Sequence, residues 1–503
     1  MPRRTTTLER VGLPTLIVAL AVAHIAYLYR VTGGWLVDDA FISFRYVENW
    51  HGGLGLVFNP GERVEGYTNF LWVALLCGAK TLGAPLIGAA RAMGIVATLG
   101  TVLLLYEIGI RRVGRRLGWV PAALAAVNHS LMTWSFGGLE MPLFLLLLLL
   151  GTYGLFVRPT RWATCAFALM ALTRPEGYLL LLIGAPMAHV VASRPAPRWQ
   201  RLGPSAVAGL LVGGHLAFKL GYYGSLLPNT FYAKVGFDLE QLPRGLEYLA
   251  GALGSYGLLI PASTLLLLSR GRGRWQRFLL VTLLSYAGYV IYSGGDPLPG
   301  FRLALPLLPL GWLALVELIR WWPQRTRLGT ALVVVLLHLN SASQGLPGMP
   351  KGAAFHHFKD DKVSVCGAHI GRWFAAHVPP GTSLATNTAG SIPYYARHLR
   401  VIDMLGLTDP VIARSAPRVG RGYAGHERHD ADHVLRQQPE FVLLCFSCVT
   451  DKPCLPSCRE LARRPEFKRL YRRHRVEQDG FRFVVYRRHE PRGSGPDAAG
   501  SSR

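Results

Sequence analysis

Long apolar stretches alternate with short polar segments along the first two thirds of the chain. A helix needs about 20 predominantly apolar residues to cross a membrane. The first stretch, residues 13–29, predicts an uncleaved anchor, with a cleaved signal peptide as the alternative. The run at 70–82 is too short to span and predicts a helix lying in the membrane interface. Further spans are expected at about residues 87–110, 119–134, 141–157, 162–173, 178–193, 203–220, 248–268, 278–293, 301–319 and 328–344.

Basic residues gather between these spans and set their orientation. Of the 503 residues, 50% are hydrophobic and 17% are charged, which is typical of a membrane protein, and the net charge is +25. The clusters at 111–116, 158–161, 194–201, 270–277 and 320–327 follow every second span, so the positive-inside rule places them in the cytoplasm with the N-terminus. This topology explains the basic excess, and no nucleic-acid motif is present. We therefore expect a lipid bilayer, and no nucleic acid, as a partner.

Eleven spans place the C-terminal part outside the membrane. We expect a transmembrane domain at residues 1–344, an extracytoplasmic domain at 345–490 and a disordered tail at 491–503. The second of these is called the C-terminal domain below. Within it, helical and strand-like segments alternate, which predicts an α/β fold. Helices are expected near 370–376, 391–397 and 432–437, and strands at 383–386, 400–404, 441–445, 468–475 and 481–487.

Five of the seven cysteines lie in the C-terminal domain. Four of them, Cys445, Cys448, Cys454 and Cys458, have C-x2-C-x5-C-x3-C spacing, and Cys366 lies apart. In an oxidising compartment this pattern predicts at least one disulfide among the four. A zinc site is the alternative, although zinc ribbons have a longer gap between their cysteine pairs.

The stretch that follows the first span, residues 33–72, carries adjacent carboxylates, Asp38 and Asp39. On a helical wheel, Phe44, Tyr46, Val47 and Trp50 share one face, and Arg45, Glu48 and Asn49 share the other. Such a helix would lie flat on the membrane and hold the carboxylates where a lipid-linked substrate meets water. The alternative is a solvated acidic loop.

Four further outer loops each carry charged or amide side chains next to a Gly/Pro turn. Ionisable residues near membrane depth are candidates for function, and four such loops on one face predict a shared polar cavity. The candidate lining residues are Glu65, Tyr67, Glu140, Glu176, His215, Asn229 and Asp296, and the candidate cations are Arg174, Lys219, Lys234 and Arg302.

Several of these segments resemble the GT-C superfamily of integral-membrane glycosyltransferases. The first-loop segment VDDAFISFRYVENWHGGLGLVFNPGERVEGYTNFLW, with GLEMPLF, LTRPEG, LLPNTFYAK, YSGGDPLPGFR and VIDMLGLTDP, resembles the terminal arabinofuranosyltransferases of mycobacterial cell walls and their bacterial relatives. One departure is Pro297, because the family pattern has an aromatic residue after the aspartate at Asp296.

The resemblance implies an inverting transfer of a sugar, arabinofuranose in this branch, from a polyprenyl-phosphate donor to an envelope glycan or glycolipid. It also implies that the transfer takes place on the outer face of a bacterial inner membrane. An aspartate removes the proton of the acceptor hydroxyl, and the resemblance favours Asp38 for that role. The phosphate leaving group needs positive charge, which Arg174, Lys219, Lys234 and Arg302 would supply. No cofactor is expected with certainty, and a divalent cation at the acidic loops is left open.

Two other classes compete with a transferase. A transporter would carry charges near mid-membrane and a repeated half-structure, and neither is visible in the sequence. A non-catalytic envelope or motility protein would use the C-terminal domain alone and would leave the polar loops without a role.

The charge alternation makes a topology prediction. A reporter that is active only in the cytoplasm, fused after Arg487, should be silent, because eleven spans place that residue outside. The same reporter fused after Arg116 should be active. Activity of the Arg487 fusion would contradict the orientation of every loop described above.

Overall fold

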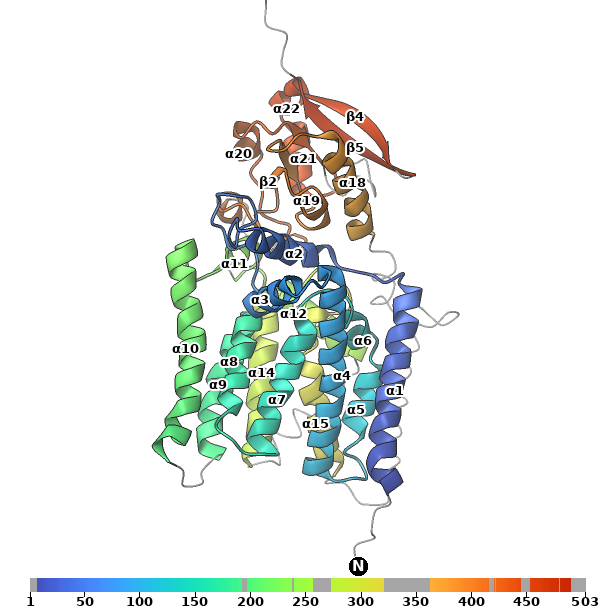
Figure 1. Ribbon diagram of the computed structural model, residues 1–503, viewed down its shortest axis with the longest axis vertical. Coiled ribbons are helices and arrows are strands. Elements are labelled where there is room, and N and C mark those ends of the chain that lie inside the picture. Colours follow the sequence, from blue (N-terminus) through green and yellow to red (C-terminus); the bar gives the residue numbers. More distant parts are fainter. Residues whose placement is uncertain are drawn as a thin grey trace, which may run out of the picture.

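The computed structural model describes residues 7–191, 197–237, 239–256, 273–320, 362–415, 420, 422–444, 453–478 and 480–489. Two parts stack along the long axis of the molecule: a bundle of roughly parallel helices and, at one end of it, a domain with a β-sheet (Figure 1). The predicted boundary at 344/345 lies outside the described residues. The bundle contains α1 (Thr7–Val31), α4 (Leu86–Val113), α5 (Val120–Val127), α6 (His129–Trp134), α7 (Met141–Phe156), α8 (Ala163–Thr173), α9 (Glu176–Val191), α10 (Arg198–Tyr223), α12 (Leu242–Tyr256), α14 (Arg274–Ser293) and α15 (Leu307–Ile319).

These helices follow the predicted apolar stretches closely. Among the described residues, two helical segments, Gly12–Val31 and Leu86–Val113, are long and apolar enough by themselves to cross a membrane. Five shorter apolar helices accompany them: α7, α8, α9, α15 and α3 (Phe70–Thr81). The span expected at 328–344 lies outside the described residues, and the number of eleven spans stays a prediction.

One predicted span is interrupted. The stretch 119–134 forms two short helices, because Asn128 between them has an extended backbone (φ −78°, ψ 116°). Its side chain accepts a hydrogen bond from the Leu131 backbone N–H at 2.9 Å and so caps α6. Asparagine competes in this way for backbone donors and favours a helix start over a helix interior.

Two short helices lie across the end of the bundle, between it and the sheet domain: α2 (Asp38–His51) and α3 (Figure 1). A helix was predicted in this stretch, but the two faces of α2 do not separate buried from exposed side chains. Both Arg45 and Asn49, from the polar face, are buried, whereas Trp50 from the apolar face is partly exposed. The polar face is covered because the C-terminal domain packs on it.

Arg45 connects α2 to that domain. Its guanidinium donates to the Phe58 carbonyl at 2.7 Å and, in the C-terminal domain, to the carbonyls of Pro393 at 2.6 Å and Leu399 at 3.0 Å. Asn59 Oδ1 accepts a further hydrogen bond at 3.3 Å. A buried guanidinium is tolerated only when its donors are satisfied, and here backbone carbonyls from two parts of the chain satisfy them.

The C-terminal domain has a five-stranded mixed sheet in the order β2-β1-β3-β5-β4. Strand β1 (Ser383–Thr386) pairs in parallel with β2 (Arg400–Asp403) and β3 (Phe441–Val442), and β5 (Phe481–Arg488) pairs antiparallel with β3 and with β4 (Tyr471–Gln478). The helices are α18 (Val363–His377), α19 (Ser391–Tyr395), α20 (Ala431–Arg436), α21 (Pro456–Arg463) and α22 (Pro465–Leu470). The predicted helices and strands occur in the expected order. The helices α21 and α22 were not predicted, residues 468–470 end α22 instead of starting a strand, and β3 is shorter than the strand expected at 441–445.

The cysteines depart from the predicted pattern. Cys366, which the spacing left out of the candidate set, is disulfide-bonded. Cys454 and Cys458 carry reduced thiols, and the Cys458 thiol donates to Asn387 Oδ1 at 2.8 Å. Cys445 and Cys448, the other two members of the predicted set, lie outside the described residues.

Loss of Arg45 should loosen the junction between α2 and the C-terminal domain. Arg45→Met leaves buried carbonyls without donors, which should lower the free energy of unfolding by about 3 kcal/mol. Arg397→Met is a matched control, because Arg397 also bridges to α2 through Glu48 but is exposed, so its loss should have an effect below about 1 kcal/mol. Thermal unfolding of the purified variants measures both, and equal losses would contradict the role of Arg45.

Candidate active site

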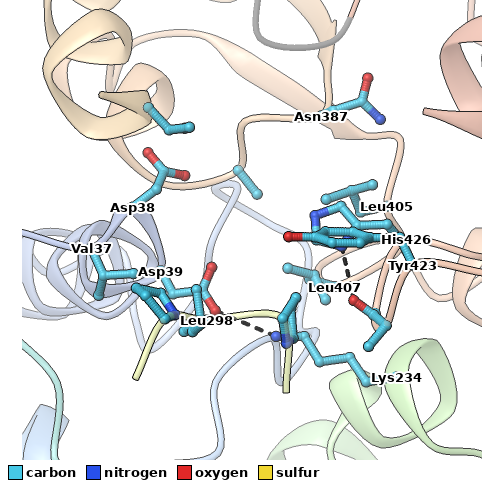
Figure 2. A pocket seen from close by; sticks show the side chains of 16 residues that line it. Val37, Asp38, Asp39, Lys234, Leu298, Asn387, Leu405, Leu407, Tyr423 and His426 are labelled. Atoms are coloured by element: carbon cyan, nitrogen blue, oxygen red, sulfur yellow. Dashed lines mark hydrogen bonds and ion pairs between the residues drawn. The ribbon is translucent and has the colours of Figure 1, made fainter. Parts of the chain in front are cut away.

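Two cavities meet where the C-terminal domain rests on the bundle. The bundle-side cavity, of about 570 Å³, is lined mainly by the loops between bundle helices. The domain-side cavity, of about 290 Å³, lies between the start of α2 and loops of the C-terminal domain (Figure 2). Asp39 and Lys234 line both cavities, so a carboxylate and an ammonium group stand where the two spaces join.

The bundle-side cavity collects nearly all of the residues that the sequence nominated. All four candidate cations line it, as do six of the seven candidate lining residues. Each cation has a carboxylate partner within the same cavity. The pairs are Arg174 with Glu140 and Glu176, Lys219 with Glu65, Lys234 with Asp39, and Arg302 with Asp296.

The predicted neighbours Arg174 and Glu176 form a buried ion pair. Arg174 follows the end of α8, and its guanidinium also reaches Glu140 at the start of α7, so one cation is held between two carboxylates. The hydroxyls of Tyr286 and Tyr289 donate to Glu176 at 3.3 and 3.2 Å. These hydrogen bonds satisfy the Glu176 carboxylate, as a buried charge requires.

Lys219 on α10 reaches Glu65 at 3.0 Å, and both side chains are buried. Burial raises the pKa of Glu65 to about 7, although the charge of Lys219 opposes the rise. Glu65 therefore exchanges its proton near neutral pH.

Two opposing effects set the pKa of Asp39. Burial alone would raise its pKa, but the positive charges of Lys234 and Arg302 outweigh burial and hold the pKa below its usual value. Lys234 Nζ lies 3.4 Å from Asp39 Oδ2, and Arg302 is fixed at 2.7 Å by Asp296. Asp39 is therefore ionised at neutral pH and stands beside two cations.

Asp38 points away from Asp39, as expected for adjacent residues of a helix. Its carboxylate accepts hydrogen bonds from the backbone N–H groups of Gly390 at 3.0 Å and Ser391 at 2.9 Å, and from the Ser391 hydroxyl. These donors lie at the start of α19 in the C-terminal domain. Asp38 thus borders the domain-side cavity and also joins α2 to the domain that covers it.

The C-terminal domain contributes to the domain-side cavity the residues that come after two of its strands. Asn387 and Ala389 come directly after β1, and Leu405 and Leu407 come after β2. Crevices at the carboxyl ends of parallel strands are common ligand sites in open α/β sheets. These four residues were not among the candidates predicted from the sequence, although they follow the predicted strand ends at 386 and 404. Tyr423 and His426, on the far side of the cavity, had no such signal (Figure 2).

Asn229 is the one candidate lining residue that lies outside both cavities. It begins α11 (Asn229–Lys234), and its amide donates to the carbonyls of Gly406 at 2.8 Å and Leu407 at 3.2 Å. It thereby fixes the loop after β2 against the segment that carries Lys234.

Among the described residues, no group of three or more His, Cys, Asp or Glu side chains is arranged to hold a metal ion. A divalent cation at the acidic loops stays a prediction.

In fold, the chain is similar to solved membrane glycosyltransferases. The structure of ArnT from Cupriavidus metallidurans bound to undecaprenyl phosphate matches with a TM-score of 0.58 at 15% identity, over 96% of this chain and 98% of that chain. The Archaeoglobus fulgidus oligosaccharyltransferase in complex with zinc and sulfate matches with a TM-score of 0.50 at 12% identity, over 78% of this chain and 62% of that chain. The chain therefore shares its overall fold with these enzymes, as the resemblance predicted.

In sequence, the chain is similar to curated terminal β-(1→2)-arabinofuranosyltransferases. The Mycobacterium tuberculosis protein is 32% identical over 252 residues, which cover 45% of this chain and 39% of that relative. The Corynebacterium glutamicum protein is 29% identical over 362 residues, which cover 61% and 52%. The chain thus spans about half the length or less of these relatives. Residues 356–489 also match a domain of unknown function, DUF8728.

The raised pKa of Glu65 makes stability depend on pH. Above the ordinary pKa of 4.5, the unfolded chain loses this proton while the folded chain keeps it until about pH 7. Wild type should therefore lose stability between about pH 4.5 and 7, on the order of 3 kcal/mol. Glu65→Gln mimics the protonated form at every pH, so its melting temperature should rise relative to wild type over this range and then level off. A difference between the two melting temperatures that is constant from pH 4.5 to 8 would contradict the shift.

Proposed function

We propose that the protein is a glycosyltransferase that moves a sugar from a polyprenyl-phosphate donor to a glycan or glycolipid of the cell envelope, on the outer face of the membrane. The observation that carries the proposal is the junction of two cavities at Asp39 and Lys234. One cavity lies on the bundle side and is lined by four cationic side chains. The other lies under the C-terminal domain. A transfer reaction needs two substrates to meet at one such point.

The donor fits the bundle-side cavity. Its phosphate carries negative charge, Lys234 stands at the junction with the domain-side cavity, and Arg302 lines the bundle-side cavity close enough to lower the pKa of Asp39. The lipid chain would extend toward the apolar helices of the bundle. The ArnT neighbour was solved with undecaprenyl phosphate, and the curated relatives are arabinofuranosyltransferases, which favours an arabinofuranosyl donor.

The acceptor fits the domain-side cavity, where its hydroxyl can approach the junction. In the reaction, the acceptor oxygen bonds to the anomeric carbon as the bond from that carbon to the phosphate oxygen breaks. The hydroxyl proton passes to a carboxylate, and the polyprenyl phosphate leaves with the bonding electrons. Attack from the face opposite the phosphate inverts the anomeric carbon.

Geometry favours Asp39 as the carboxylate that takes the proton, because it lines both cavities. Its pKa is held low by Lys234 and Arg302 before the donor binds. A bound phosphate would draw these cations to itself, and the basicity of Asp39 would then rise. Asp38, which the resemblance favours, already accepts three hydrogen bonds from α19 and would instead position α2.

The roles of the two aspartates can be separated. Asp39→Asn keeps the size of the side chain but removes the proton acceptor, so transfer should fall on the order of a hundredfold or more, if proton removal is in the slow step. Asp38→Asn cannot accept all three hydrogen bonds and should impair transfer through misplacement of α2. The assay is transfer from a synthetic polyprenyl-phosphate arabinofuranose to an arabinan oligosaccharide by the purified full chain.

Ser391→Ala is the matched control for the positioning role. It removes one donor to Asp38 without touching the carboxylate, and should lower both transfer and melting temperature as Asp38→Asn does, but less. If Asp39→Asn keeps near-full activity, Ser391→Ala has no effect and Asp38→Asn is inactive but stable, Asp38 is the base. Wild-type protein without transfer activity on any polyprenyl-phosphate sugar would overturn the proposed function.

A further inference from the structure

We propose that Tyr423 forms a stacking subsite for a sugar ring of the acceptor, and that the segment 422–427 fixes it there. This inference rests on the proposed function and deepens it, because it names the group that recognises the acceptor. Tyr423 lines the domain-side cavity with 56% of its surface exposed. Figure 2 shows it with His426 across the cavity from Asp38 and Asp39.

The segment is anchored to the bundle by Glu427. This buried carboxylate accepts hydrogen bonds from the backbone N–H groups of Gly420 at 2.7 Å and Gly422 at 3.3 Å, and forms an ion pair with Arg244 on α12. Arg244 in turn donates to the Gly294 carbonyl, just after α14, at 2.9 Å. A segment of the C-terminal domain is thus held on two bundle helices.

The same segment separates the two cavities. Ala424 and Gly425 line both of them, and Gly425 has a left-handed backbone (φ +71°). A Cβ atom at Gly425 would lie 3.3–3.5 Å from the Lys234 side chain, so the backbone packs directly on that lysine. The position of Tyr423 is therefore tied to the junction at which transfer is proposed.

The ring of Tyr423 is oriented by its neighbour. It lies 4.9 Å from the His426 ring, between centroids, and His426 Nδ1 lies 3.0 Å from the Ala424 carbonyl oxygen. Burial lowers the pKa of His426, so the imidazole is neutral near pH 7, and a neutral ring that donates from Nδ1 leaves Nε2 as an acceptor.

These features match the chemistry of a saccharide. One face of a sugar ring presents C–H groups that stack on an aromatic ring, and its edges present hydroxyls. Tyr423 together with the buried Leu405 and Leu407 gives apolar surface, while Asn387 and the two aspartates give polar groups on other sides. Aromatic surface with a few placed polar groups is typical of small-molecule sites. A sugar stacked on Tyr423 would point a hydroxyl across the cavity toward Asp39.

The test compares Tyr423→Ala, Tyr423→Phe and the control Val411→Ala. Val411 is another exposed apolar residue of the C-terminal domain and does not line either cavity. Tyr423→Ala should raise the KM for an arabinan oligosaccharide on the order of tenfold, with the donor KM and kcat within twofold of wild type. Tyr423→Phe keeps the ring and should stay within threefold, and Val411→Ala should match wild type.

A binding measurement keeps this inference separate from the proposed function. Calorimetric titration of the donor-free full chain with the same oligosaccharide should give a Kd that Tyr423→Ala weakens by the same factor. This result would support the subsite even if wild type failed to transfer, a failure that would overturn only the proposed function. An unchanged Kd and acceptor KM in Tyr423→Ala, or no oligosaccharide binding by wild type, would overturn the subsite.

Discussion

The site depends on how α2 is held between the bundle and the C-terminal domain. Arg45 binds carbonyls of that domain through its guanidinium, and Asp38 binds amides of the same domain through its carboxylate. Arg45 therefore binds backbone acceptors of the C-terminal domain, and Asp38, seven residues earlier, binds backbone donors of the same domain. The Arg45 bonds are buried and the Asp38 bonds are partly buried, so both are stronger than they would be in water. Asp39, between the two anchors, is fixed at the point where the cavities meet.

The charges of the bundle-side cavity follow one electrostatic rule. Each of the four predicted cations lines this cavity and pairs with a carboxylate of the same cavity. Pairing makes buried cations tolerable before a substrate arrives, and holds them in place for an anionic ligand. The pairs differ in geometry: Arg174 lies between two buried carboxylates, whereas Lys234 and Asp39 are 3.4 Å apart and about one third exposed. The longest and most exposed of these pairs lies at the junction, where a phosphate would have the least to displace.

Two buried polar residues have roles that the sequence did not predict. Asn229 was expected to line the site and Arg45 belongs to the polar face of the predicted helix, and both bind backbone carbonyls of the C-terminal domain. These contacts leave no periodic signal, because the partners in that domain lie more than a hundred residues away. Asp296, by contrast, pairs with the nearby Arg302 although the residue after it departs from the family pattern.

The sequence by itself determined most of the helices, most of the strands and the list of charged residues that share a cavity. Apolar runs of membrane length, charge alternation and strand-like periods are local properties, so most element positions could be predicted from them. It could not distinguish the two adjacent carboxylates, because neighbouring aspartates on one helix differ only in what packs against each. Only the tertiary structure separates their surroundings: the start of α19 donates hydrogen bonds to Asp38, whereas Asp39 lines both cavities beside Lys234. Tyr423 likewise gains its place only because Glu427 ties a distant loop to α12.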